Sequence, residues 1–453
     1  MKAYRDAQIS LFQSAVSQVI EKHTLSQILS VGGTAVLSRS TADDPMLDAV
    51  TAFAESAGSE DLPKIAAPQT LSIADGAKYC VNMSLKLGEA LGKALVTGDQ
   101  TEIQRYRDQL SKFTECDPRW AEAAAVYADY FVAQGRAIPY KSVNTIPDPV
   151  ITDLPSQVRV AIVGDWGTGQ PAARTVLSQI KAMQPKIIIH LGDVYYAGTQ
   201  YEYDNYFTGI WSQVFGVAPG QPGCPTLYNL SGNHDMYSGG QAYYKLLQSI
   251  GQPASFFILQ NDNWQLLSMD TGLHDADPVS LGHSPTVLDP DEAKWVCKKV
   301  SNQGQRKTIF FSHHQLFSGY EKIGDSPVNQ SLLTQLQSIL DKTTMWIWGH
   351  EHNFVVFNKY FGIYGRCLGH GAFPVGIDEP QESVLPGVPV IASVRLDKGV
   401  SFYRHGFAIL DIDGPTASVC YYEDSSTTTP LYKENIAANG IVTAAPGFPA
   451  KKP

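Results

Sequence analysis

The sequence predicts an α/β fold with two domains. In its second two-thirds, continuous apolar and β-branched segments, typical of buried strands, alternate with segments whose apolar residues recur at helical spacing. A chain of 453 residues is also long for one compact domain. The expected strands include residues 158–163, 186–191, 226–230, 308–311 and 345–348, and the expected helices include 171–183 and 290–300. This alternation indicates a buried, largely parallel sheet.

The N-terminal part has a different pattern. Apolar stripes at helical spacing, such as Leu85, Leu87, Leu91 and Leu95, predict a helical accessory domain. Several prolines then mark a linker, and near the end two apolar runs flank Asp413-Gly414 and predict a hairpin. The expected organisation is an accessory domain over 1–137, a linker over 138–157, the main domain over 158–435 and a loosely ordered tail over 436–453.

Composition narrows the possible partners and compartment. The formal net charge of −10 argues against binding to duplex nucleic acid but is compatible with a small phosphorylated substrate. No segment predicts a membrane span or a signal peptide, so we expect a cytoplasmic protein, or an exported one if a leader has been removed. The six scattered cysteines favour free thiols over disulfides and zinc ribbons.

Five short segments place metal-binding side chain types directly after predicted strands. Polar side chains at the carboxyl ends of neighbouring parallel strands gather at one edge of a sheet, so we expect one shared site. The segments are Gly164-Asp165-Trp166-Gly167, Gly192-Asp193-Val194-Tyr195-Tyr196, Gly232-Asn233-His234-Asp235, Ser312-His313-His314 and Gly349-His350-Glu351-His352. Their oxygen and imidazole donors suit two adjacent cations, which together with a water can hydrolyse a phosphate ester.

This combination of motifs resembles the calcineurin-like metallophosphoesterase superfamily. Two details resemble its purple acid phosphatase branch: Gly167 stands where many relatives have histidine, and Tyr196 lies three residues after Asp193. A phenolate would replace the missing imidazole and favour a hard trivalent ion. The resemblance implies a four-layer αββα metallophosphoesterase sandwich for the main domain.

The resemblance also implies a ligand set for two metal ions. It places Fe³⁺ at a first site, and Zn²⁺, Mn²⁺ or Fe²⁺ at a second site, with Asp193 bridging the two ions. The first site would comprise Asp165, Asp193, Tyr196 and His352, and the second Asp193, Asn233, His313 and His350.

The implied activity is that of an acid-phosphatase-like phosphoric ester hydrolase. A metal-bound hydroxide would attack a phosphate monoester, and His234 would donate a proton to the leaving group. Asp235 could orient His234 and raise its pKa, or it could simply cap the following turn. His314 and His370 are candidates for lining the substrate pocket.

Two alternatives remain at this stage. The same site could hydrolyse a cyclic nucleotide or another phosphodiester. In a different class, some relatives of this fold have lost their metals and act as protein-binding scaffolds; the filled ligand positions argue against that interpretation. The sequence does not indicate the natural substrate or the oligomeric state.

Overall fold

The computed structural model describes residues 138–146, 150–151, 154–275, 286–377, 383–400 and 402–448, which belong to one compact unit of the chain. The helical accessory domain predicted for residues 1–137 lies outside these residues and stays a prediction.

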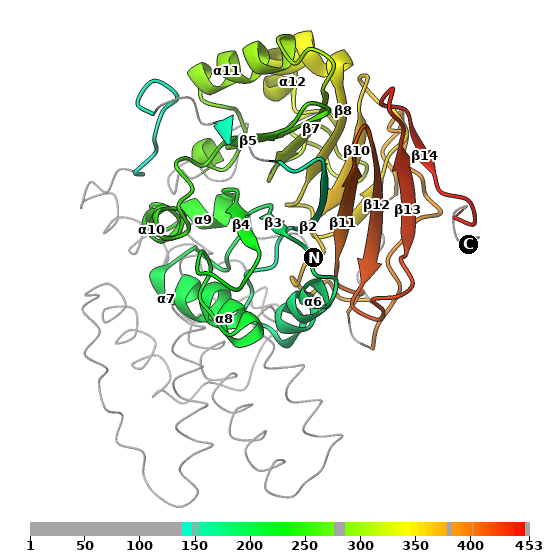
Figure 1. Cartoon of the computed structure of the whole chain (residues 1–453). Coiled ribbons are helices and arrows are strands. Elements are labelled where there is room, and N and C mark those ends of the chain that lie inside the picture. Colours follow the sequence, from blue (N-terminus) through cyan, green and yellow to red (C-terminus); the bar gives the residue numbers. More distant parts are fainter. Residues whose placement is uncertain are drawn as a thin grey trace, which may run out of the picture. The chain divides into compact units, whose positions relative to one another are not determined.

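Two seven-stranded sheets form the centre of this unit (Figure 1). We call them the β7 sheet and the β2 sheet. The β7 sheet has the order β1 (Val150–Ile151), β5 (Phe257–Gln260), β6 (Trp264–Ser268), β7 (Lys307–Ser312), β8 (Thr343–Trp348), β10 (Tyr364–Leu368) and β9 (Phe354–Val356). The β2 sheet has the order β14 (Val442–Ala444), β13 (Tyr432–Ile436), β12 (Thr416–Glu423), β11 (Gly406–Asp413), β2 (Gln157–Val163), β3 (Ile187–His190) and β4 (Thr226–Asn229).

Both sheets are mixed, and their parallel parts contain the strands predicted from sequence. β2, β3 and β4 are parallel to one another, and so are β6, β7, β8 and β10. The predicted hairpin is confirmed as the antiparallel pair β11 and β12. The carboxyl ends of the parallel strands are where the five motif segments begin.

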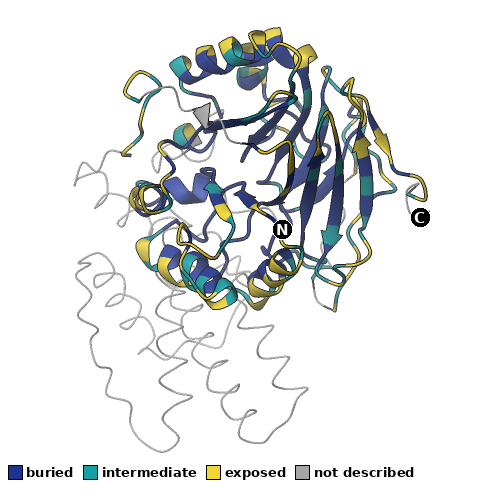
Figure 2. Ribbon diagram, viewed as in Figure 1, coloured by how far each residue is buried: buried dark blue, intermediate teal, exposed yellow. Residues whose placement is uncertain are grey.

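Three hydrophobic cores lie between the sheets and helices and hold them together. Along β2, Val158, Val160 and Ile162 face the core between the sheets, whereas Ala161 and Val163 belong to a second core with outer helices. A third core covers the other face of the β7 sheet. The outer helices are α6 (Pro171–Ala182), α8 (Gly209–Phe215) and α10 (Gln241–Ile250) on the β2 sheet, and α11 (Pro290–Ser301) and α12 (Gln330–Leu336) on the β7 sheet. The predicted four-layer αββα sandwich is thus confirmed, and its strands are mostly buried (Figure 2).

Local sequence signals account for the ends of these helices. Both α6 and α11 begin with proline, whose fixed φ suits the first helical position. The Asp289 side chain caps α11 by accepting from the backbone N–H groups of Asp291 and Glu292. Shorter elements complete the described fold: α7 (Gln200–Glu202), η3 (Tyr203–Thr208), α9 (Asn233–Met236), η4 (Leu273–Asp275) and η5 (Gln337–Lys342).

The segments predicted as linker and tail make specific contacts where the structure describes them. Tyr140 donates a hydrogen bond to Glu292 at 3.3 Å, and β1 pairs with β5. At the other end, β14 pairs with β13 and buries Val442. These contacts join residues on both sides of the predicted main domain to its two sheets.

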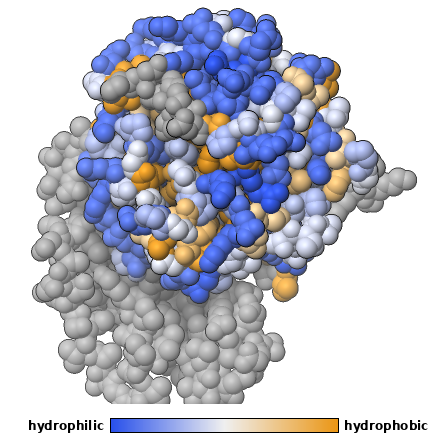
Figure 3. Space-filling model, viewed as in Figure 1, coloured by the Kyte–Doolittle hydropathy of each residue, from blue (hydrophilic) through white to orange (hydrophobic). Residues whose placement is uncertain are grey.

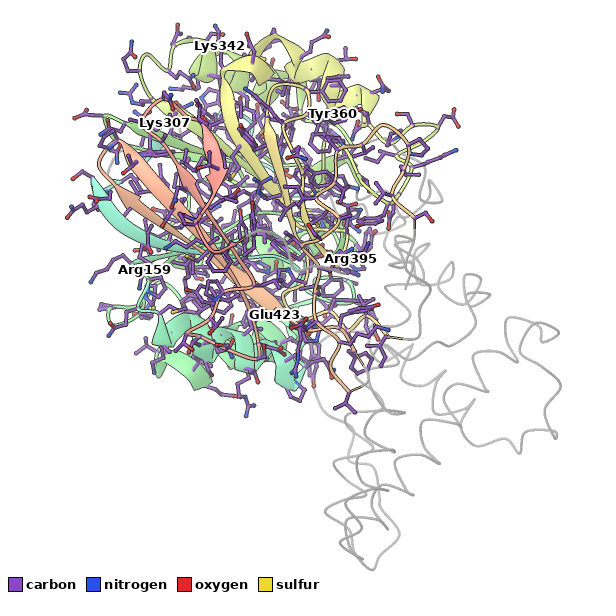
Figure 4. The ribbon with its side chains drawn as sticks, turned by 90° about the vertical axis from the view of Figure 1, so that its right-hand side faces the viewer. Arg159, Lys307, Lys342, Tyr360, Arg395 and Glu423 are labelled. Carbon is purple, nitrogen blue, oxygen red and sulfur yellow. The ribbon has the colours of Figure 1, made fainter. Side chains whose placement is uncertain are left out.

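The surface of the described part carries ordinary polar contacts. The face in Figure 3 is mostly hydrophilic, with smaller hydrophobic patches. Figure 4 labels Arg159, whose guanidinium pairs with Asp411 at 2.7 Å. It also labels Lys307, which is largely buried and whose Nζ lies 4.4 Å from the centre of the Trp264 ring. None of the helices in the described ranges has the length and apolarity needed to cross a bilayer.

Candidate metal centre

Two groups of donor side chains lie beyond the strand ends. One contains Asp165, Asp193 and His352, and the other contains His313, His314 and His350. Within each group, one donor atom from every residue lies within 4.8 Å of the others, and all six residues are buried. Asp165 and Asp193 follow β2 and β3, whereas the four histidines follow β7 and β8. Both sheets therefore supply the site, whereas the strand pattern of the sequence predicted the edge of one largely parallel sheet.

The backbone is bent sharply at four of these donors. Asp165, Asp193, His350 and His352 have φ values of 55°, 76°, 67° and 48°, in the left-handed region that non-glycine residues rarely adopt. The turns also require glycine where chains approach closely. A Cβ on Gly232 would lie 2.0 Å from Asp193 Oδ1, and one on Gly349 would lie 2.5 Å from Asp165 Oδ2. The glycines of the motifs thus leave room for the carboxylates beside them.

A phenol lies against the first donor group. Tyr195 Oη donates to Asp165 Oδ1 at 2.6 Å and lies 2.8 Å from His352 Nε2. The ring of Phe373 stacks on His352 with centroids 3.8 Å apart, which holds the imidazole in place. Two carboxylates, an imidazole and a hydroxyl make this group rich in oxygen.

The phenol that the structure brings to this group belongs to Tyr195, whereas the resemblance points to Tyr196. The backbone of Tyr196 contacts the site, because its carbonyl oxygen lies 2.5 Å from His234 Nδ1 and its N–H donates to Glu202. The sequence offers two adjacent tyrosines, and motif spacing alone selected the second.

The second donor group converges on His313. Its Nε2 lies 3.1 Å from Asn233 Oδ1, 3.2 Å from His350 Nδ1 and 3.3 Å from Asp193 Oδ2. Its Nδ1 lies 3.0 Å from the carbonyl oxygen of Leu191, which can only accept. Nδ1 therefore carries a proton, and Nε2 is the nitrogen that faces the other donors and could bind a metal ion in place of a second proton.

Asp193 links the two groups electrostatically. Burial alone would raise the pKa of its carboxyl, but the adjacent His313 and His234 lower that pKa below its usual range. Burial lowers the pKa of His313, and Asp193 more than offsets this, raising it to about 9. A cation at this position would replace the positive charge that a proton on His313 provides.

His234 is oriented by a carbonyl group and not by Asp235. Since the Tyr196 carbonyl accepts from Nδ1, Nε2 is the nitrogen that can give or take a proton at the site, and it lies 4.0 Å from Asp193 Oδ2. Burial lowers the pKa of His234, against the raising effect of Asp193. The predicted rise in this pKa through Asp235 is therefore not what the structure shows.

Asp235 instead fastens two motif loops together. Its carboxylate accepts from the N–H groups of Asp193, Val194 and Gly232 at 2.9, 3.1 and 2.7 Å, and from Tyr203 Oη at 2.6 Å. The contact with Gly232 is the capping alternative considered from sequence. Burial and Asp193 raise the pKa of Asp235 to about 7, while these hydrogen bonds act in the opposite direction.

Glu202 performs a similar task on the following loop. Its carboxylate accepts from the N–H groups of Tyr196, Ala197 and Thr199. Sequence reasoning overlooked Glu202 and Tyr203. For Glu202, a signal was present, because Thr199 and Glu202 have the spacing of a capping box, which the structure contains.

The two candidates for lining the substrate pocket lie in different places. His314 is a member of the second donor group. The ring of His370 packs against Phe354, with centroids 5.3 Å apart, and its backbone carbonyl accepts from Gly406. His370 belongs to neither donor group, although it follows β10 just as the other histidines follow β7 and β8.

The donor chemistry fits two cations. Carboxylates and a phenol suit a hard ion, and imidazoles with an amide oxygen suit a divalent transition metal. The ring nitrogen that faces the other donors is fixed by a backbone contact in His313, as in many metal-binding histidines. Such an arrangement can bind and polarise a phosphate group.

Comparison with known proteins agrees with this chemistry. Residues 158–354 match the family model for calcineurin-like phosphoesterases. Similar solved structures include GAP50, the anchor in the inner membrane complex of Plasmodium, with 16% identity, a TM-score of 0.43 and coverage of 61% of this chain and 87% of that chain. Another is a dimetal phosphatase from Danio rerio, with 12% identity, a TM-score of 0.42 and coverage of 62% and 99%. Neither likeness decides the activity here, and no curated protein matches the chain.

Proposed function

Since this chain carries a calcineurin-like phosphoesterase domain, we propose that it hydrolyses phosphate monoesters at a site for two metal ions. The family and the two donor groups support a metal-dependent phosphoester hydrolase. The preference for monoesters, the identity of the ions and the roles of individual residues are parts of the proposal.

One observation carries it: donors from both sheets meet at Asp193. Asp193 is a member of the oxygen-rich group, and its Oδ2 lies 3.3 Å from His313 Nε2 of the imidazole group. A carboxylate in this position can bridge two ions. In the proposal, Asp165, Asp193 and His352 would hold the first ion, and Asp193, Asn233, His313 and His350 would hold the second.

The first ion would be Fe³⁺ with a phenolic ligand. Motif spacing favours Tyr196 for that ligand, but the hydroxyl beside Asp165 and His352 is that of Tyr195. We therefore assign the phenol to Tyr195, with Tyr196 as the competing assignment that a pair of variants can test.

The protein's own residues would position the substrate and move the proton. When bound, the ions would neutralise phosphate charge and lower the pKa of a coordinated water. His234 Nε2 would give its proton to the leaving oxygen while the Tyr196 carbonyl holds Nδ1. Asp235 would hold the loop at Asp193 against the turn that contains Asn233 and His234, through hydrogen bonds to both.

Metal analysis combined with a substrate panel tests this function. We expect two ions per chain by elemental analysis, and faster hydrolysis of phosphomonoesters than of cyclic nucleotides or linear diesters. Faster hydrolysis of a diester would replace the proposed substrate class with the phosphodiesterase alternative. A metal-free, fully stable protein that hydrolyses none of them would favour the scaffold alternative.

A further inference from the structure

A loop outside the five motif segments contacts two of them. It comprises residues 270–272, just beyond β6, and we call it the β6 loop. The side chains of Asp270 and Thr271 are fully buried there, although both are polar. Buried polar side chains in proteins are almost always hydrogen-bonded, so the partners of these two side chains indicate what the loop does.

One side of the β6 loop lies against the segment that follows β4. The Ser231 hydroxyl donates a hydrogen bond to Asp270 Oδ1. A Cβ on Gly272 would lie only 2.6 Å from the carbonyl oxygen of Gly232, so this glycine allows the two backbones to touch. Both contacts are made by the two residues that directly precede Asn233, a proposed ligand of the second ion.

The other side of the β6 loop lies against the segment that follows β7. Thr271 Oγ1 accepts a hydrogen bond from the backbone N–H of His314 at 3.0 Å. The Ser312 hydroxyl donates to the His314 carbonyl at 2.7 Å, so the backbone bends around His313. Nε2 of His313 lies 3.1 Å from Asn233 Oδ1. The β6 loop therefore contacts both segments whose donors meet at the second metal position.

Hydrogen bonds within the loop and to a helix hold the β6 loop itself. Asp270 Oδ1 also accepts from the N–H groups of Gly272 and Leu273, at 3.1 and 3.0 Å, at the start of η4. The Asp270 N–H donates to Glu292 Oε1 of α11 at 2.8 Å. The loop is thus anchored to a helix that packs on the β7 sheet, and it can serve as a fixed support for the two motif segments.

We propose that the β6 loop is a positioning segment for the second ion, and that it sets the separation of Asn233 and His313, ligands that come from different sheets. The proposal rests on the metal site of the proposed function and adds residues that bind neither metal nor substrate. Ligands that are already held at the right distance bind an ion more tightly. Residues that hold ligands in this way typically change metal affinity by roughly 10- to 100-fold.

The effect should be selective for one of the two ions. In the described structure, no hydrogen bond joins Asp270 or Thr271 to Asp165 or His352 of the first donor group. The alternative is a loop that only stabilises the fold. In that role, substitutions in the loop would lower the melting temperature and would change the affinity for both ions or for neither.

The experiment titrates metal-free protein with Zn²⁺ against a chromophoric chelator, without substrate. Ser231→Ala removes the hydrogen-bond donor on the β4 side of the loop, and Thr271→Val removes the acceptor on the β7 side. We expect both variants to bind the same one of two zinc ions about tenfold or more weakly, and to bind the other as the wild type does. Ser249→Ala removes a hydroxyl that bonds within its own helix, α10, and is the matched control with wild-type affinity for both ions.

A double-mutant cycle identifies the ion and the route of the effect. Asn233→Ala removes a proposed ligand of the second ion and therefore marks which affinity belongs to it. Because Ser231 acts through Asn233 in the proposal, Ser231→Ala should add little to the loss that Asn233→Ala causes. A serine that only stabilises the fold would not show this coupling.

Gly272→Ala tests the close backbone contact. The added methyl group would press on the Gly232 carbonyl and displace the segment that carries Asn233, so the second ion should again bind more weakly. Gly209→Ala, at the start of α8, is its control. There the added Cβ would lie 2.8 Å from the Asp204 carbonyl oxygen, and zinc affinity should not change.

Wild-type affinity for both ions in folded Ser231→Ala and Thr271→Val proteins would overturn the proposal, and so would equal weakening of both ions. Thermal melting shows whether each variant folds, and Gly272→Ala is measured in place of one that does not. Failure of the substrate panel would reject the proposed function while leaving the zinc affinities, and their dependence on the β6 loop, as a separate result.

Discussion

The two sheets supply the centre with different chemistry. In the β2 sheet, the residues that follow β2, β3 and β4 contribute the carboxylates of Asp165 and Asp193 and the amide of Asn233. In the β7 sheet, the residues that follow β7 and β8 contribute imidazoles. Oxygen donors thus come mainly from one sheet and nitrogen donors from the other. The fold itself separates a harder ligand set from a softer one.

The separation is incomplete at two residues. His352 follows β8 but joins the oxygen-rich group, and Asp193 follows β3 but contacts His313 of the other sheet. Each group therefore receives a ligand from the opposite sheet. Binding two ions would join the sheets at their strand ends, so metal content and the packing of the sandwich should depend on each other.

Replacing Asp193 should have the largest effect, because it removes the carboxylate shared by both groups. We expect Asp193→Ala to reduce turnover by about a thousandfold or more and to lower the metal content below that of the wild type. Elemental analysis and initial rates on a phosphomonoester measure both. Asp411→Ala removes a partly exposed carboxylate of β11 that pairs with Arg159, away from both donor groups, and is the control. Near-normal turnover in Asp193→Ala would mean that the two groups work independently.

His234 follows β4 of the β2 sheet, whereas the other histidines of the site follow β7 and β8. In the proposal it transfers a proton and the others bind metal. If it donates a proton and binds no metal, His234→Ala should retain both ions and lose about a hundredfold in turnover. The loss should shrink for a phosphate ester with a good leaving group, which needs no proton. Equal losses for good and poor leaving groups would remove His234 from the proton transfer.

Variants of Tyr195 and Tyr196 test which phenol belongs to the oxygen-rich first donor group. After loading with iron, we expect a visible phenolate-to-iron absorption band that Tyr195→Phe abolishes and Tyr196→Phe retains. The physical reason is the 2.6 Å contact of the Tyr195 hydroxyl with Asp165. The reverse result would restore the motif-based assignment to Tyr196. A wild-type protein that binds iron without this band would show that no phenol is a ligand.

Strand ends and donor types were predictable from sequence because they depend on local pattern. Apolar runs followed by glycine and a polar side chain place Asp165 and His313 at the sheet edge whatever the details of packing. The choice between Tyr195 and Tyr196 depends on which hydroxyl reaches Asp165 and His352, residues distant in the sequence that come together only in the folded protein. The role of Asp235 likewise depends on backbone groups of a loop more than 40 residues away.

The pairing of strands into sheets also depends on contacts that the local sequence pattern does not reveal. Alternating strands and helices predicted a largely parallel sheet, and the observed sandwich has two mixed sheets. Hydrophobic runs show that strands such as β2 and β7 are buried, but they do not say which strands pair. The partition into two sheets arises from long-range contacts such as the antiparallel pairing of β11 with β2.

Two histidines outside the site should have the smallest effect, on stability. His370 follows β10 but does not join the imidazole group, and His405 precedes β11. Burial, with a contribution from nearby positive groups, lowers the pKa of His370 to about 3 and of His405 to about 4. In the unfolded chain both should titrate near pH 6.5.

Proton uptake decides whether acid raises or lowers the free energy of unfolding. Well above pH 6.5 both histidines are neutral in the folded and in the unfolded protein, so their titration does not change the free energy of unfolding. As the pH falls from 6.5 toward 4, the unfolded chain binds protons that the folded protein does not, so the free energy of unfolding falls by up to about 1.4 kcal/mol per pH unit for each histidine. His370→Gln should therefore reduce the acid dependence of urea unfolding measured between pH 6.5 and 4, and the exposed His274→Gln should not. An identical slope in the wild type and His370→Gln would show that His370 accepts a proton inside the fold, and that the β7 sheet tolerates a charged imidazole away from the metal site.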